Sequence, residues 1–109
     1  MLSIDVNNKI KMVRGDTACI EISLDNHTLV KGDQVKFTVK KSMTSEEVSI
    51  QKIITEFTDE GTAMLRLLEE DTKDLDAGDY LYEIEVRLID GTIDTIINAV
   101  QFKIVADLG

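Results

Sequence analysis

The side chains that could carry out chemistry are few in this sequence. It contains one cysteine, Cys19, and one histidine, His27. A serine or cysteine nucleophile needs a base within reach, usually a histidine, and we expect His27 to be a solvated residue of the polar loop 25–28. One cysteine and one histidine are also too few for a zinc site. The sequence therefore predicts no catalytic residue, no cofactor, no metal ligand and no enzymatic activity.

Acidic residues are concentrated in one segment, where they could in principle bind a cation. The segment contains Glu69, Glu70, Asp71, Asp74, Asp76 and Asp79. Carboxylate oxygens suit Ca²⁺, but the spacing does not match an EF-hand loop. The simpler interpretation is that Asp71 caps a short helical turn, Asp76 braces the bend that follows, and the other side chains are solvated.

The tripeptide Arg14-Gly15-Asp16 matches a short motif that integrins recognise. A match of three residues often arises by chance. Glycine between two polar residues is also typical of a tight turn. We therefore interpret these residues as a turn between the strand expected at 9–13 and the alternating segment 17–24.

The balance of charge limits the class of partner. The chain has 109 residues, of which 21 are acidic and 12 are basic, so its net charge is −9. A surface of this sign repels phosphate backbones and anionic lipid headgroups. We expect no nucleic-acid and no membrane partner, and the N-terminus lacks the pattern of a secretory signal. The classes of partner left by this argument are proteins with a basic face and further copies of the chain joined through an apolar patch.

A period of two dominates the hydrophobic pattern, as in strands with one buried and one solvated face. The clearest alternating segments are residues 17–24, 34–40 and 80–88. Weaker strands are expected at 2–6, 9–13, 48–57, 62–68 and 92–105. Turn residues separate these segments, and a chain of this length can bury one core. The sequence predicts an all-β, two-sheet sandwich of about seven to eight strands, with residues 1–109 as a single domain.

Two of the strands contain a break in the alternation. One break is at Ile53-Ile54 and the other is near Asn98-Ala99, and each suggests a β-bulge. Because the chain has no proline, charged side chains must guard the sheet edges. The candidates for this role are Lys36, Lys40 and Arg66.

The segment 75–82 carries a more specific structural signature. In immunoglobulin-like sandwiches, a tyrosine at the start of the sixth strand bonds back to the backbone of the preceding loop. Asp76, Gly78 and Tyr80 have the spacing of this structural corner, so we expect an immunoglobulin-like β-sandwich. Alternation places Cys19 away from the core. The predicted core consists of Ile20, Ile22, Phe37, Val39, Leu65, Tyr82, Ile84, Val86, Val100 and Phe102.

Several short segments together resemble a known family. They are residues 14–17, residues 32–40, Asp71-Thr72, residues 75–84 and residues 90–93. In this order and spacing they resemble the N-terminal immunoglobulin-like domain of baseplate upper proteins and related tail-fibre proteins of phages that infect Gram-positive bacteria.

The resemblance implies a structural or assembly module of a phage or prophage-derived tail or baseplate. Such a module is made in the bacterial host cytoplasm, resides in the virion, and contacts other tail or baseplate proteins or copies of itself as a homo-oligomer. Contact through a sheet face or edge would use apolar anchors. The exposed apolar residues that we expect to form this interface are Met12, Met64, Leu81 and Ile89.

An alternative interpretation is an immunoglobulin-like adhesion or carbohydrate-accessory module of a bacterial surface protein. Sugar binding favours exposed aromatic side chains. Aromatic residues make up only 5% of this chain, tryptophan is absent, and alternation places both tyrosines on the core face. The composition therefore favours the protein-binding interpretation.

Overall fold

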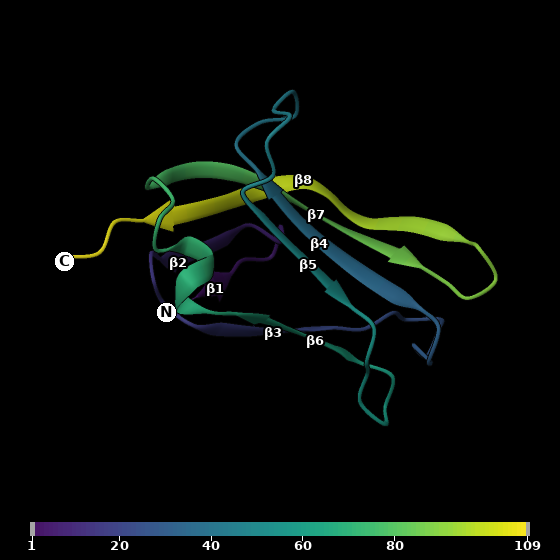
Figure 1. Ribbon diagram of the computed structural model, residues 1–109. Coiled ribbons are helices and arrows are strands. Elements are labelled where there is room, and N and C mark those ends of the chain that lie inside the picture. The colour runs from purple at the N-terminus through teal and green to yellow at the C-terminus, as the bar shows by residue number, and fades with distance from the viewer. Residues whose placement is uncertain (1, 109) are drawn as a thin grey trace.

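The computed structural model describes residues 2–108, and in that range it is built almost entirely of strands (Figure 1). The strands are β1 (Ser3–Ile4), β2 (Ile10–Val13), β3 (Ala18–Ile22), β4 (Gln34–Lys40), β5 (Ile50–Ile54), β6 (Ala63–Leu67), β7 (Gly78–Arg87) and β8 (Ile93–Val105). One short helix, α1 (Glu69–Thr72), lies between β6 and β7. Each predicted strand is present, most of them shorter than expected at one or both ends.

The strands form two sheets of unequal size. The larger sheet has six strands in the order β1-β2-β8-β7-β4-β5, and the smaller sheet pairs β3 with β6. Figure 1 shows the β3–β6 pair lying below the larger sheet. Neighbouring strands are antiparallel except β2 and β8, which are parallel. Two facing sheets with almost no helix make this a small all-β sandwich, and the predicted fold class is confirmed at that level.

The core lies between the inner face of the larger sheet and the β3–β6 pair, where alternate residues of each strand point inward. Three rings form its centre, with Phe37 5.7 Å from Tyr82 and 6.1 Å from Phe102 between ring centroids. Buried residues from both sheets form one cluster. Of the ten predicted core residues, Ile20 and Val100 are only partly buried and the others are buried.

Helix α1 is linked to the inner face of β5. The carboxylate of Asp71 accepts a hydrogen bond of 2.7 Å from the backbone N–H of Leu68, so it caps the helical turn as expected. The same carboxylate forms an ion pair of 2.9 Å with Lys52. Because Lys52 lies opposite the buried Phe37 in the ladder, this ion pair fixes the helix beside the core.

The predicted structural corner is present at the start of β7. The hydroxyl of Tyr80 donates a hydrogen bond of 2.7 Å to the backbone carbonyl of Asp76. Burial raises the pKa of Tyr80 above its ordinary value, with the Asp76 carboxylate adding to the effect. Gly78 has φ of +146°, a backbone conformation that favours glycine. The corner therefore fixes the chain where it enters β7.

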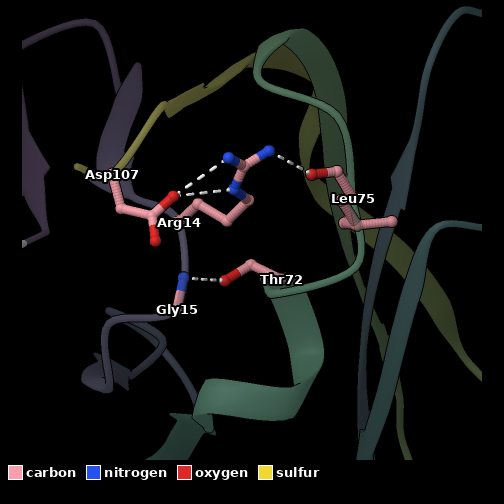
Figure 2. Close-up of polar contacts among 5 residues, drawn as sticks. All are labelled: Arg14, Gly15, Thr72, Leu75 and Asp107. Carbon is pink, nitrogen blue, oxygen red and sulfur yellow. Dashed lines mark hydrogen bonds and ion pairs between the residues drawn. The ribbon is translucent and has the colours of Figure 1, made fainter. Parts of the chain in front are cut away.

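A second set of polar contacts fixes the same end of the sandwich (Figure 2). Arg14 donates to the carboxylate of Asp107 through Nε at 3.1 Å and Nη2 at 2.9 Å, and to the carbonyl of Leu75 through Nη1 at 3.2 Å. The N–H of Gly15 donates to Oγ1 of the buried Thr72 at 2.8 Å. The turn interpretation of Arg14-Gly15-Asp16 is confirmed, and the guanidinium of Arg14 joins this turn to the α1–β7 connection and to the segment after β8.

The two predicted bulges have different outcomes. The β7–β8 ladder shifts register between Tyr82 and Glu85, and Ala99 has a left-handed φ of +52°, so the break near Asn98-Ala99 is confirmed. The β4–β5 ladder is continuous from Ile50 to Ile54, and the bulge predicted at Ile53-Ile54 is wrong. Both isoleucines fit a regular strand, because one points inward and the other is exposed on the outer face.

Candidate interaction surface

His27 and Asp33 form a polar contact at the base of β4. The carboxylate of Asp33 is buried and accepts hydrogen bonds from Nε2 of His27 at 2.9 Å, the N–H of Val30 at 2.9 Å and the N–H of Ile89 at 2.8 Å. These bonds, of which that with His27 has the largest effect on the pKa, hold the pKa of Asp33 below its ordinary value. His27 lies in the loop where it was expected, but the expectation that its side chain is solvated is wrong, because its nitrogen contacts and stabilises a buried carboxylate.

The acidic segment 69–79 is divided among separate partners. Asp71 binds Leu68 and Lys52, as described above, and Asp79 accepts a hydrogen bond of 3.0 Å from the side chain of Gln101. The exposed carboxylate of Asp76 lies 3.9 Å from Lys41 Nζ. Among the described residues, no three His, Cys, Asp or Glu side chains are grouped so that they could hold a metal ion. Cys19 is a free, exposed thiol on β3.

The four predicted interface residues lie in different parts of the molecule. Ile89 is exposed at the β7–β8 turn, with 71% of its surface accessible. Met64 and Leu81 are half-buried, on the outer faces of the smaller and larger sheets respectively. The exposure expected for Met12 is wrong. β2 pairs with the C-terminal end of β8, where Met12 lies opposite Ile104 and is fully buried.

A groove of about 270 Å³ lies on the outer face of the larger sheet. We call it the outer-face groove, and it is lined by Lys36, Thr38, Lys40, Ser42, Met43, Val48, Gln51, Leu81, Tyr82, Glu83 and Ala99. Leu81 contributes to it from β7, while Met43 and Val48 come from the β4–β5 loop and are 69% and 41% exposed. In Figure 1 this loop rises above the sheet beside β4 and β5. The groove therefore combines an apolar side with lysine, serine and threonine side chains.

One charged residue of the groove, Lys36, belongs to a cluster of paired charges on the outer face of the sheet. Glu85 Oε1 accepts a hydrogen bond of 2.7 Å from Nε of Arg87 and lies 3.9 Å from Lys36 Nζ. The bond from Arg87 is the main cause that lowers the pKa of Glu85. Lys40, by contrast, lies opposite Leu81 in the β4–β7 ladder. Its ammonium group is available at the edge of the groove.

The groove adjoins β5, which ends the larger sheet and has β4 as its only neighbour. Lys36 and Lys40 were predicted to guard an edge, but β4 lies between β5 and β7, so this assignment is wrong. Arg66 does lie on an edge strand, because β6 pairs only with β3. On β5 the one charged residue is Lys52, which is held by Asp71. The edge of β5 is left with the exposed Ile53.

Sequence analysis missed three contributors to this surface, namely Met43, Val48 and Ile53. The signal for Met43 and Val48 was an apolar side chain inside the otherwise polar segment 41–49. The signal for Ile53 was the break in alternation, which was interpreted as a bulge. A second apolar face on a strand can instead indicate a contact surface.

No helix in the described part of the chain is long and apolar enough to cross a membrane. In comparisons with known proteins, no family model matches this chain, and no curated protein matches it by sequence.

Proposed function

We propose that this chain is a structural or assembly module of a phage or prophage-derived tail or baseplate, and that it acts by binding protein. The observation that carries the proposal is the β5 side of the larger sheet. There, a groove with an apolar side adjoins a strand edge whose one charged side chain, Lys52, is neutralised by Asp71. Exposed apolar residues grouped beside polar ones are typical of protein contact sites, and an open edge can accept a further strand.

The use of the polar side chains supports a binding role over a catalytic one. The one histidine binds a buried carboxylate, and Arg14 and Asp71 join elements of the fold. General acid–base or nucleophilic catalysis needs such groups to converge on a substrate. Here they stabilise the sandwich, which suits a rigid part of a larger assembly.

The position of the aromatic side chains argues against the carbohydrate-accessory alternative. Phe37, Tyr80, Tyr82 and Phe102 are buried, and Phe57 is partly buried against the same core. Stacking on a sugar ring needs an accessible aromatic face. The phage assignment itself is supported by the resemblance of the ordered segments, and by the corner at Tyr80 on which that resemblance partly depends.

The proposal can be tested by following a tagged chain into particles. Tail-like particles would be induced in the bacterium that encodes the chain, purified by density, and probed for the tag. We expect the chain in the particles, and we expect Met43→Asp to reduce its incorporation at least severalfold. Val6→Asp is the matched control, because Val6 is 97% exposed in the β1–β2 loop, far along the chain from the groove. Absence of the wild-type chain from purified particles would overturn the proposal.

A further inference from the structure

We propose that two copies of this chain pair through β5 as antiparallel strands centred on Ile53. Six strands from each copy would then form one continuous sheet. This inference deepens the proposed function, since it rests on the β5 side as a contact surface and names a second copy as one occupant.

The first argument is that the free edge of β5 lacks most of the features that usually prevent strand pairing. A strand at the end of a sheet presents unpaired N–H and C=O groups, and native proteins usually protect it with proline, a bulge, a charged side chain, a covering helix or loop, or a very short strand. β5 has five residues, contains no proline and keeps an unbroken register with β4. Its one charged side chain, Lys52, points to the inner face, where Asp71 neutralises it. At the opposite end of the sheet, β1 has only two residues. The edge strands of the smaller sheet carry the exposed charges Glu21 and Arg66.

The second argument is self-complementary register. Antiparallel pairing about Ile53 places this side chain opposite Ile53 of the second copy on the outer face. The same register places Lys52 opposite Ile54 of the second copy on the inner face. A register centred on Lys52 would instead oppose two lysines, which is unfavourable. Ile53 is 56% exposed, so the preferred register buries apolar surface that is otherwise in water.

The third argument is the local charge. Two chains of charge −9 repel each other, but β4 and β5 contain no aspartate or glutamate. Of their lysines, Lys36 lies near Glu85 and Lys52 is paired with Asp71 within the same copy. The two edges can therefore meet without opposed acidic side chains. The repulsion that remains is long-range, and added salt screens it.

The pairing can be tested with a cysteine on the proposed two-fold axis. In a Cys19→Ser background, Ile53→Cys would place two thiols opposite each other, within reach of a disulfide. With oxidised glutathione as the oxidant, we expect a covalent dimer on a non-reducing gel at least tenfold faster than for Val6→Cys, the exposed control. Gln51→Cys tests the register, because its two copies would lie four ladder positions apart and should not cross-link. Equal rates for Ile53→Cys and Val6→Cys, or faster cross-linking of Lys52→Cys, would overturn the proposal.

Sedimentation of the unmodified chain gives an independent measurement. We expect a monomer–dimer equilibrium whose dimer fraction rises with protein concentration and with salt, and a monomer for Ile53→Lys with an unchanged circular dichroism spectrum. A chain that stays monomeric yet enters tail particles would refute the β5 pairing and leave the proposed function standing. A dimer that cross-links at residue 53 but is absent from particles would support the pairing and refute the phage role.

Discussion

The carboxylate of Asp33 accepts a hydrogen bond of 2.8 Å from the backbone N–H of Ile89, which lies 56 positions later in the chain. This bond joins the loop before β4 to the turn after β7. Gly32 contributes to the same contact, because a Cβ at this position would lie only 2.7 Å from Cδ1 of Ile89. Asp33 therefore fixes the end of the sheet opposite the Tyr80 corner.

Replacing Asp33 tests this contact directly. Asp33→Ala removes a buried acceptor and leaves the N–H groups of Val30 and Ile89 without their partner. Hydrogen bonds to charged groups contribute about 1.5–3 kcal/mol each, and the remaining groups can partly rehydrate, so we expect a loss of about 3 kcal/mol in the free energy of unfolding. Urea denaturation measures it, with the exposed Asp25→Ala as the control. A loss below about 1 kcal/mol would contradict the structural role of Asp33.

The same carboxylate predicts how stability depends on pH. The folded state lowers the pKa of Asp33, mainly through the hydrogen bond from His27, so folding favours the ionised form. Its contribution is complete above the unfolded pKa of about 3.9 and is lost as pH falls through the lower folded value. We expect the stability difference between wild type and Asp33→Asn to be constant from about pH 5 to 6 and to shrink below about pH 4. A difference that does not change between pH 6 and 2 would show that Asp33 is not ionised in the fold.

Tyr82 predicts a response at alkaline pH. Its hydroxyl donates a hydrogen bond of 2.5 Å to the carbonyl of Asn8, and burial raises its pKa to about 12. Because the folded pKa lies above the unfolded value of about 10, the stabilisation is complete below pH 10 and is lost as pH rises through 12. In Tyr80→Phe, Tyr82 is the one remaining tyrosine and no tryptophan interferes. We expect its absorbance at about 295 nm to titrate near pH 12 in the folded state and near pH 10 in urea. A folded-state midpoint near 10 would place Tyr82 in solvent.

The structural features that could be predicted from the sequence are those determined by residues close together in the chain. β4 was predicted with its observed bounds, because alternation within Gln34–Lys40 reflects a strand with one buried face. The corner at Tyr80 was also predictable, since its hydrogen bond spans only four residues. The bulge at Ala99 was visible as a slip in the same alternation.

The errors concern contacts between distant segments. Met12 is buried because β2 pairs with β8, about 90 residues later in the chain, and no local pattern indicates that pairing. The contacts of Asp33 likewise depend on the position of Ile89, in a distant part of the sequence. The candidate surface depends on which strand ends the sheet. Lys36 and Lys40 were assigned to an edge because the order of strands in a sheet cannot be read from the sequence, and the structure places β4 inside the sheet.

Arg14 predicts a coupling between three connections of the fold. Arg14→Ala removes its hydrogen bonds to Asp107 and Leu75. The side chain is partly exposed, so we expect a moderate loss of about 1–2 kcal/mol in the free energy of unfolding. Hydrogen–deuterium exchange should become faster in residues 72–76 and 105–108, while the β4–β5 ladder stays protected. Lys11→Ala, at an exposed position of the preceding strand β2, is the control. Unchanged exchange in both segments would show that the guanidinium does not hold them together.

Ala99 offers a test in which neighbouring substitutions have opposite effects. Its φ of +52° is costly for a residue with a Cβ and acceptable for glycine. Ala99→Gly removes this strain but increases the freedom of the unfolded chain, so we expect a net gain of about 0.5 kcal/mol in the free energy of unfolding. Asn98→Gly, at the adjacent exposed position without a positive φ, should instead lose about 0.5–1 kcal/mol. Urea denaturation of the two variants gives the comparison. If both glycines destabilise the fold equally, the left-handed conformation at Ala99 carries no strain and the bulge has another origin.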